Sequence, residues 1–261
     1  MTPKLMGVVN ATPDSFFDGG LYLDAEAAVA HGGELARDGA DILDIGGEST
    51  RPGAEEVSAG EERARVEPVV AGLAATATVS IDTSKASVAE AALDAGASIV
   101  NDVTALRGDP AIGGLCAERG VGLVLMHMRG DPRTMQEEPR YEDVVDEVKA
   151  FLAERTEVAV AAGVPEERIW LDPGIGFGKT VDHNLELLRR LGELRELGRP
   201  LVVGTSRKSF IGKIDGSDVG DRIGGTIASS VLAAAEGADV LRVHDVAESR
   251  QALLMATAIL G

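Results

Sequence analysis

Two groups of polar side chains, each placed just after a short apolar run, carry the chemistry of this chain. Asp82, Asn101 and Asp172 combine carboxylates with an amide. Because a carboxylate only accepts hydrogen bonds and an amide both donates and accepts, this set suits a heterocycle with adjacent N–H donors and ring acceptors. The second set is cationic, and it comprises Arg51, Lys208, Arg242 and His244. Such cations favour phosphate oxygens, so the two sets predict a polar heterocycle with a phosphate-like tail.

The stretch Asp172–Lys179 reads Asp-Pro-Gly-Ile-Gly-Phe-Gly-Lys and follows the apolar run Ile169–Leu171. Proline stops a strand, and glycine allows backbone conformations that let the main chain approach a ligand closely. The spacing is neither that of a P-loop nor that of Gly-x-Gly-x-x-Gly, because the position five before Gly178 is Pro173. An ordinary glycine-rich turn is the alternative for this stretch taken alone.

The elements that position these groups form a repeating pattern. Short apolar runs alternate with longer segments of helical composition, and such runs are typical of parallel strands that are buried on both faces. The predicted strands are Leu5–Val9, Ile42–Ile45, Val79–Ile81, Ile99–Val100, Leu123–Met126, Ile169–Leu171, Leu201–Val203 and Val240–Val243. The predicted helices are Asp24–Asp38, Ala59–Ala75, Ser84–Ala95, Pro110–Arg119, Tyr141–Ala162, Asn184–Leu197, Asp218–Ala235 and Ala247–Leu260.

Eight βα units in one chain of 261 residues predict an α/β fold, a (β/α)₈ TIM barrel that forms a single domain over residues 1–261. A doubly wound open sheet is the alternative, and the even spread of the units disfavours it. Start signals at Asp24 and Ser84 mark the beginnings of helices. Six glycines mark the ends, namely Gly39, Gly96, Gly120, Gly163, Gly198 and Gly237. The polar residues follow the strands, whereas Gly and Ala dominate the returns. The site is therefore expected in the βα loops at the C-terminal ends of the strands.

Composition excludes several other classes of protein. A net charge of −18 offers no positive field for a nucleic acid, so any anionic ligand must be held by a local cluster of cations. The chain has no signal peptide and no apolar run long enough to span a membrane, which predicts a cytoplasmic protein with no membrane association. The single cysteine, Cys116, is expected to be a core residue.

The metal expected from the sequence is magnesium. Neither His-x-x-x-His nor Cys-x-x-Cys spacing occurs, which disfavours a dedicated zinc site. Mg²⁺ takes only one or two protein oxygens when it shares a substrate phosphate, and Asn10 or Asp82 is a candidate donor. His31 and His183 lie in predicted helices and are interpreted as non-functional.

Each site residue also has an ordinary structural interpretation. Asp82 has roughly even odds of capping the helix that follows it. Asn101 would then bond only its own turn, Arg242 would pair with Asp245, and His244 would be a satisfied structural histidine.

The segments 10–20 and 49–57 are long enough to act as lids. A helix that begins near Ser209 would offer free N–H groups to a second anion such as a carboxylate.

Eight motifs in register resemble those of the dihydropteroate synthase family over nearly the whole chain. They are residues 6–16, 46–53, 80–83, 100–103, 126–130, 172–179, 204–209 and 242–245, which include Gly-Gly-Glu-Ser-Thr-Arg-Pro-Gly and Gly-Thr-Ser-Arg-Lys-Ser. The resemblance implies condensation of 6-hydroxymethyl-7,8-dihydropterin diphosphate with p-aminobenzoate, which gives 7,8-dihydropteroate and diphosphate in folate biosynthesis. It also implies Mg²⁺ as cofactor and a homodimer. Ala11 and Phe17 depart from the family's first loop, so closure of that loop is expected to differ slightly.

The resemblance further implies a role for each matching residue. Asp82, Lys208 and Arg242 are the catalytic residues, and Asn10 is the metal ligand. The pterin ring contacts Asp82, Asn101, Met126, Asp172, Lys208 and Arg242. The diphosphate contacts Asn10, Thr50, Arg51, Arg242 and His244, and the aminobenzoate contacts Thr50, Arg51, Pro52, Phe177, Lys208 and Ser209. A methyltransferase that binds a methylated folate and a non-catalytic pterin-binding protein are the alternatives, and the retained cations disfavour both.

Overall fold

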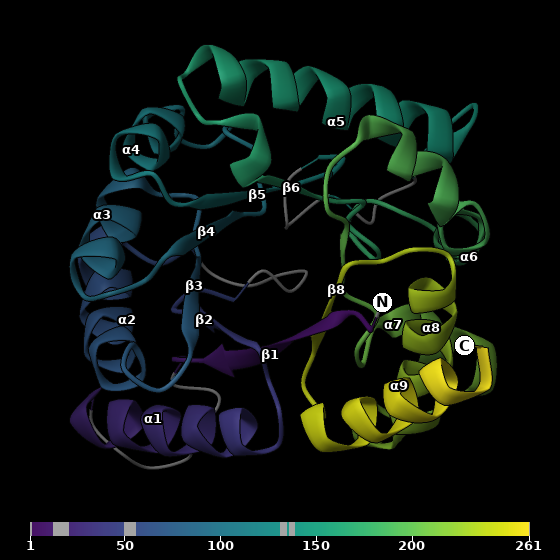
Figure 1. Cartoon of the computed structure of the whole chain (residues 1–261), viewed down its shortest axis with the longest axis horizontal. Helices are drawn as coiled ribbons and strands as arrows, with labels where there is room; N and C mark the ends of the chain where they lie inside the picture. Colours follow the sequence, from purple (N-terminus) through teal and green to yellow (C-terminus); the bar gives the residue numbers. More distant parts are fainter. Residues whose placement is uncertain (1, 13–20, 50–55, 131–134, 136–138, 261) are drawn as a thin grey trace.

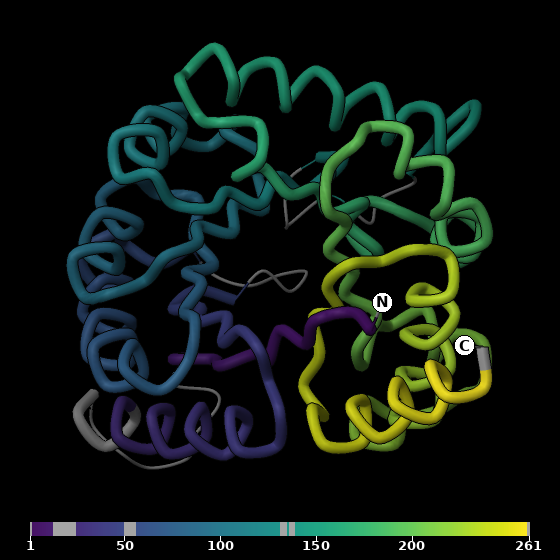
Figure 2. Tube along the Cα trace, viewed as in Figure 1, coloured from purple at the N-terminus to yellow at the C-terminus, as the bar shows by residue number. Residues whose placement is uncertain are grey.

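Eight parallel strands form one closed barrel in the computed structural model, which describes residues 2–12, 21–49, 56–130, 135 and 139–260. The sheet order is β6-β5-β4-β3-β2-β1-β8-β7, and a parallel bridge between Leu171 and Leu201 joins the two ends. Helices surround this barrel (Figures 1 and 2), so the predicted (β/α)₈ fold is confirmed. The strands are β1 Lys4–Asn10, β2 Ile42–Gly46, β3 Thr78–Asp82, β4 Ile99–Asp102, β5 Gly122–Met126, β6 Ile169–Asp172, β7 Val202–Val203 and β8 Val240–Val243.

The helices follow the predicted segments, with differences at their ends. The α-helices are α1 Leu21–Arg37, α2 Ala59–Leu73, α3 Ala86–Asp94, α4 Ala111–Arg119, α5 Val144–Ala161, α6 Val181–Arg189, α7 Ser209–Asp215, α8 Ile223–Ala235 and α9 Val246–Leu260. Short 3₁₀ helices, η2 Glu166–Arg168, η3 Leu191–Leu197 and η4 Val219–Asp221, accompany them. The predicted segments 184–197 and 218–235 each divide into an α-helix and a 3₁₀ helix.

The two start signals were wrong. Helix α1 begins at Leu21, three residues before Asp24. Helix α3 begins at Ala86, and Ser84 is not its cap, because the free N–H of Ala86 donates to Asp109 Oδ2 at 2.9 Å. A carboxylate from the following βα loop thus caps α3, and this tertiary contact is invisible in a local pattern.

The predicted glycine stops are confirmed. All six have a positive φ, the left-handed conformation that glycine adopts without steric cost. The values are 103° at Gly39, 113° at Gly96, 62° at Gly120, 97° at Gly163, 68° at Gly198 and 99° at Gly237.

The barrel interior is layered, and this layering positions the site. Side chains two residues apart on a strand point to the same face. The lower layer is apolar and contains Met6, Ile42, Ile99, Val124, Val202 and Val240, with Trp170 packed against it. The residues two positions further along six of these strands form the layer above, namely Asp44, Asn101, Met126, Asp172, Gly204 and Arg242. The interior therefore changes from apolar to polar toward the C-terminal ends of the strands.

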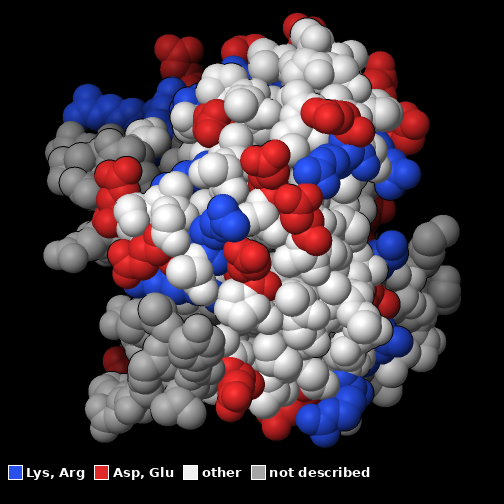
Figure 3. Space-filling view, turned by 90° about the vertical axis from the view of Figure 1, so that its left-hand side faces the viewer, with Lys and Arg blue, Asp and Glu red and all other residues white. Residues whose placement is uncertain are grey.

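The outer surface carries mixed charge. Figure 3 shows acidic and basic side chains next to one another on one side of the barrel. Ion pairs on the outer helices include Arg63 with Glu67 at 3.0 Å and Arg65 with Glu61 at 2.6 Å, both one helical turn apart. Among the described residues, none of the helices has the length and apolar character needed to cross a membrane.

Candidate active site

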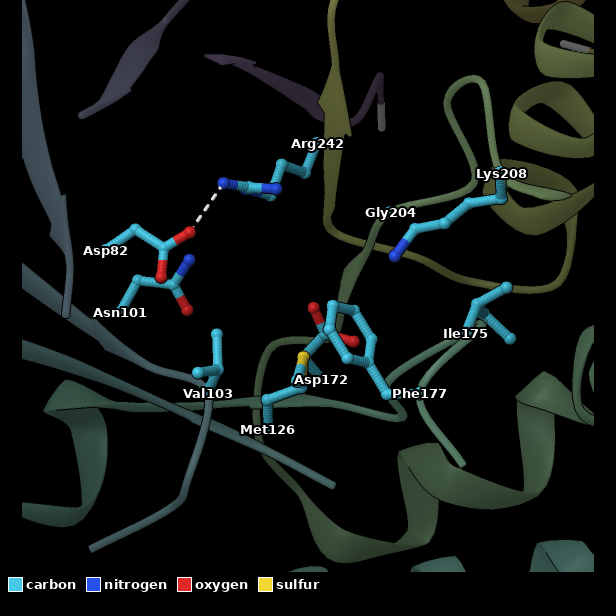
Figure 4. Close-up of a pocket in the computed structure, with 10 residues that line it drawn as sticks. All are labelled: Asp82, Asn101, Val103, Met126, Asp172, Ile175, Phe177, Gly204, Lys208 and Arg242. Carbon is cyan, nitrogen blue, oxygen red and sulfur yellow. Dashed lines mark hydrogen bonds and ion pairs between the residues drawn. The ribbon is translucent and has the colours of Figure 1, made fainter. Parts of the chain in front are cut away.

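A cavity opens at the C-terminal ends of the strands, where the sequence places the site. Seven predicted site residues line it, together with Val103, Ile175 and Gly204 (Figure 4). The seven are Asp82, Asn101, Met126, Asp172, Phe177, Lys208 and Arg242. They come from β3, β4, β5, β6 and β8 and from the segments that follow β6 and β7. Parallel strands that end at the same level bring these distant residues together.

Arg242 is held by two carboxylates. Its Nε donates to Asp44 Oδ2 at 2.6 Å, and its Nη2 donates to Asp82 Oδ2 at 2.8 Å. Burial disfavours the charged guanidinium, but Asp44 and Asp82 more than offset this effect and raise the pKa of Arg242. The alternative pairing of Arg242 with Asp245 is wrong, because Asp245 accepts from Arg207 instead.

Asp82 faces the cavity rather than capping a helix, so its capping interpretation is also wrong. Burial raises the pKa of Asp82 to about 7; Arg242 opposes the rise and Asp44 adds to it.

Asn101 does not bond its own turn through its side chain, since its Nδ2 donates to Asp44 Oδ2 at 3.1 Å. Asp44 was therefore missed by the sequence analysis, although it bonds two predicted site residues. The missed signal was its spacing, because Asp44 lies two residues after the inward-facing Ile42.

The glycine-rich segment after β6 wraps closely around Asp172. Gly174, Gly176 and Gly178 all have positive φ, at 65°, 84° and 63°. Gly174 N donates to Asp172 Oδ1 at 2.7 Å, and a Cβ on Gly174 would lie only 1.9 Å from His127 O. Burial raises the pKa of Asp172, while the Gly174 N–H and Lys208 oppose the shift. Close backbone packing therefore requires glycine at Gly174 and at Gly178, where a Cβ would lie 2.4 Å from Arg129 O, whereas a Cβ on Gly176 would meet only the Lys208 side chain.

Lys179 ties the same segment to the neighbouring strand, and it was not assigned a role from the sequence. Its side chain is buried, and Nζ contacts His127 Nδ1 at 2.9 Å, Gly174 O at 2.9 Å and Phe177 O at 3.0 Å. Burial lowers the pKa of Lys179 well below its ordinary value and that of His127 to about 2. One nitrogen thus fixes the backbone between Asp172 and Phe177.

Lys208 is a basic residue that lines the cavity. Its Nζ is 4.0 Å from the centroid of the Phe177 ring, a cation–π distance. Burial lowers the pKa of Lys208 to about 8, although Asp172 opposes the shift. Lys208 directly precedes α7, and Ser209 is the first residue of that helix. Arg207 before it has a φ of 55° and is held by an ion pair with Asp245 and a 2.9 Å bond from its N–H to Thr226 Oγ1.

His244 differs from the expected cation. Its Nδ1 lies 3.0 Å from Ser206 Oγ, and its backbone N–H donates to the same oxygen at 3.2 Å. Burial lowers the pKa of His244 to about 3, and Arg242 and Arg207 add to the shift. This low pKa favours the neutral imidazole, which is a hydrogen-bonding group next to Arg242.

Among the predicted residues not yet placed, Asn10 lies in the part of the chain that the structure describes. Asn10 ends β1, is half-buried and pairs in register with Gly46, which pairs in register with Asp82. Thr50, Arg51 and Pro52 lie outside the described residues, as does residue 17 with most of the first predicted lid. The base of the second lid is described. Glu48 Oε1 accepts from Val57 N at 2.8 Å, so the two ends of this segment are joined.

Cys116 is buried, and burial raises the pKa of its thiol to about 12, which fits a core residue. Within the part of the chain that the structure describes, no group of three or more His, Cys, Asp or Glu side chains is placed to hold a metal ion.

Comparison with known proteins identifies similar chains. The family described as "Pterin binding enzyme" matches residues 6–244. Dihydropteroate synthase of Neisseria meningitidis serogroup C is 50% identical over 256 residues, covering 96% of this chain and 90% of that protein. Dihydropteroate synthase of Escherichia coli K12 is 45% identical over 261 residues, covering 99% of this chain and 92% of that protein.

Solved structures agree with this similarity. Xanthomonas albilineans dihydropteroate synthase with 4-aminobenzoic acid is 48% identical, with a TM-score of 0.93 and coverage of 99% of this chain and 93% of that one. The same enzyme in complex with 7,8-dihydropteroate is 46% identical, with a TM-score of 0.90 and coverage of 99% and 94%.

Proposed function

This chain belongs to the dihydropteroate synthase family of pterin-binding enzymes, and we propose that the cavity at its barrel mouth carries out the family's condensation. The enzyme joins 6-hydroxymethyl-7,8-dihydropterin diphosphate to p-aminobenzoate, which yields 7,8-dihydropteroate and diphosphate for folate biosynthesis. One observation supports this function most directly: a single cavity combines the acceptors Asp172 and Asn101, the donors Lys208 and Arg242, and the aromatic ring of Phe177.

The pterin is expected to lie deep in the cavity, above the apolar layer of the barrel. Asp172 accepts from N–H groups of the pyrimidine ring, and Lys208 donates to its carbonyl and to a ring nitrogen. Asn101 and Asp82 face the remaining edge, while Met126 packs against the ring. Fixed groups of this kind bind a planar heterocycle at little entropic cost, since they are positioned before the ligand arrives.

The diphosphate is expected at the rim, where the cations gather. Arg242 contributes a planar guanidinium that Asp44 and Asp82 already orient. His244 lies near Arg242, and an anion at this position would raise the low pKa of the imidazole and favour its protonation. Thr50 and Arg51 complete this set in our proposal.

Magnesium fits the donor set at this rim. Asn10 offers one amide oxygen at the end of β1, and Mg²⁺ shared with a diphosphate needs only one or two protein oxygens. Asn10 would hold the ion, and a bound Mg²⁺ would neutralise negative charge on the leaving diphosphate.

The aminobenzoate is expected between the pterin and the solvent. Phe177 provides an apolar face, and the Lys208 ammonium lies 4.0 Å from its centroid. Ser209 lies at the N-terminus of α7, and Pro52 closes the outer side in our proposal. The carboxylate of the aminobenzoate then points toward Ser209 and solvent, and its amine points toward the pterin methylene.

The proposed mechanism is dissociative. The C–O bond between the pterin methylene and the diphosphate breaks first, and Arg242 stabilises the departing anion. The carboxylate of Asp82 favours the positive charge that develops on the pterin, and water is excluded by the bound aminobenzoate. The aryl amine then attacks the methylene carbon, forms the C–N bond and loses a proton. This sequence needs no covalent intermediate with the protein.

We also propose a homodimer that is formed through the last helices of the barrel. Among the described residues, seven of the nine exposed large hydrophobic side chains lie on α7, η4, α8 and α9. Leu232 on α8 and Leu254, Met255 and Ile259 on α9 are 54–76% exposed, and α8 packs beside α9 (Figure 1). We propose that these residues contribute to one apolar surface. A second copy that presents the same surface would cover it symmetrically.

The dimer is tested by measuring molar mass in solution. The chain is expected to elute at twice the mass of one chain, and Leu232→Glu with Met255→Glu is expected to halve that mass. Val158→Glu is the control, since Val158 is exposed on α5 outside this surface. A wild-type chain that remains a monomer at high concentration would refute the dimer.

The reaction is tested by diphosphate release from the purified protein with the pterin diphosphate and Mg²⁺, with and without p-aminobenzoate. Release that requires the amine, together with formation of dihydropteroate, is the expected result. Pterin binding without turnover would instead favour a non-catalytic pterin-binding protein. A chain that binds methylated folate but not the pterin diphosphate would favour the methyltransferase.

A further inference from the structure

Asp44 is a charged residue in the closed interior of the barrel. It lies in the middle of β2, between the inward-facing Ile42 and Gly46, and its relative exposure is 0%. Its register partners are Val8 on β1 and Ser80 on β3. A carboxylate in this position is costly unless it is paired and hydrogen-bonded. Asp44 does not line the cavity, so direct contact with a ligand does not account for it.

One oxygen of Asp44 joins two cavity residues. Asp44 Oδ2 accepts from Arg242 Nε at 2.6 Å and from Asn101 Nδ2 at 3.1 Å. The other oxygen, Oδ1, has no hydrogen-bond partner among the described residues. Asp44 thus contacts a donor from β4 and a donor from β8, and both donors belong to residues that line the cavity.

The contact with Asn101 determines which way its side-chain amide faces. A carboxylate has no donor, so only the NH₂ group of Asn101 makes a favourable contact with Asp44. The amide nitrogen in Figure 4 accordingly lies on the side of Asp82 and Arg242, and the oxygen lies on the side of Val103. Asn101 therefore presents its carbonyl oxygen to the cavity, where it can accept an N–H of the ligand.

We propose that Asp44 is a positioning and specificity-determining residue, which sets the order of hydrogen-bond donors and acceptors in the pterin pocket through Asn101. This inference rests on the proposed function, since it assumes a ligand with N–H donors at that edge. A reversed Asn101 amide would place its NH₂ group against the N–H donors of the ligand, and neither group would then have an acceptor. The bond to Arg242 Nε orients the guanidinium at the same time.

The decisive variant is Asp44→Asn, which keeps the size of the side chain and adds a donor. The new amide can donate to Asn101, so the Asn101 amide is free to reverse. We expect the dissociation constant for 6-hydroxymethyl-7,8-dihydropterin to rise at least about tenfold. In an Asn101→Ala background, the same substitution at Asp44 is expected to change pterin binding by less than about threefold. A purely structural carboxylate would show the same loss in both backgrounds.

The second variant restores an acceptor. Adding Asn101→Asp to Asp44→Asn exchanges the two side chains and ensures that only oxygens face the cavity from position 101. Pterin binding is expected to recover most of the loss caused by Asp44→Asn. Because the exchange retains both a donor and a carboxylate, it also tests the proposal if Asp44→Asn alone fails to fold.

Asp41→Asn is the matched control. Asp41 precedes the same strand at the other end of the barrel, and its Oδ2 accepts from Leu5 N at 2.8 Å. This change is expected to leave pterin affinity within about twofold of the wild type. Failure of the wild type to bind pterin would overturn the proposed function. Wild-type pterin binding that Asp44→Asn leaves intact would overturn this inference alone.

Discussion

Gly174→Ala tests how closely the segment after β6 must approach the neighbouring strand. Gly174 has a φ of 65°, and a Cβ at this position would lie 1.9 Å from the carbonyl oxygen of His127. Both partners are backbone, so no flexible side chain can move away. The two chain segments must separate by about 1 Å, a displacement large enough to cost about a hundredfold in activity near reacting groups.

The structure also gives the expected loss of stability. The left-handed conformation costs alanine roughly 1–2 kcal/mol. Separation of the segments stretches three hydrogen bonds near this position: His127 N to Asp172 O at 2.9 Å, Gly174 N to Asp172 Oδ1 at 2.7 Å, and Lys179 Nζ to Gly174 O at 2.9 Å. At about 1 kcal/mol each, these bonds bring the expected decrease in the free energy of unfolding to roughly 4–5 kcal/mol.

Gly198→Ala isolates the steric part of this loss. Gly198 has nearly the same φ, 68°, but no atom lies within 4 Å of the position of a Cβ. Urea denaturation is expected to show a decrease of only about 1–2 kcal/mol for Gly198→Ala, with unchanged pterin affinity. Gly174→Ala is expected to weaken pterin binding about a hundredfold as well. Equal stability and equal pterin affinity in the two variants would refute the packing argument.

Three further predictions concern buried titratable groups. Lys179→Met removes three hydrogen bonds of a buried ammonium, so it should lower the free energy of unfolding by roughly 3 kcal/mol or more in urea denaturation, whereas Lys149→Met on the surface should have little effect. The pKa of Asp82 is raised from 3.8 to about 7, so the folded protein binds a proton at Asp82 more tightly than the unfolded chain does. Protonation of Asp82 therefore stabilises the fold at low pH, and this stabilisation is lost as the pH rises from about 4 to about 7. Asp82→Asn should remove that contribution, at most about 1.4 kcal/mol per pH unit, from the stability profile, and an unchanged slope would contradict the assignment. Cys116 should resist iodoacetamide at pH 8 until urea is added, and rapid labelling of the folded protein would show that its thiol is accessible.

The fold was largely readable from the sequence because its signals are local. Runs of Val, Ile and Leu predicted the strands, and Gly39, Gly96 and Gly237 predicted where helices return to strands. Each such glycine has a positive φ, so residue type and backbone conformation are linked within a few residues. The polar residue after each run predicted the cavity, since parallel strands of a barrel end on one rim.

The start of α3 was less predictable, because its first free N–H group is satisfied from elsewhere in the chain. Ser84 resembles a cap, yet the N–H of Ala86 is satisfied by Asp109. Local pattern cannot choose between a nearby hydroxyl and a distant carboxylate, since both satisfy the same free N–H group.

Side-chain partners were decided by the tertiary structure alone. The structural alternative for Arg242 was a pair with Asp245, its neighbour in the sequence, but the barrel closes β8 onto β1 and places β2 next to β1. Arg242 therefore meets Asp44, 198 positions earlier in the chain, while Asp245 meets Arg207. Residue types and strand periodicity determined which groups reach the barrel mouth. Only closure of the barrel decided which charges neutralise one another there, because a buried charge pairs with the nearest opposite charge in space.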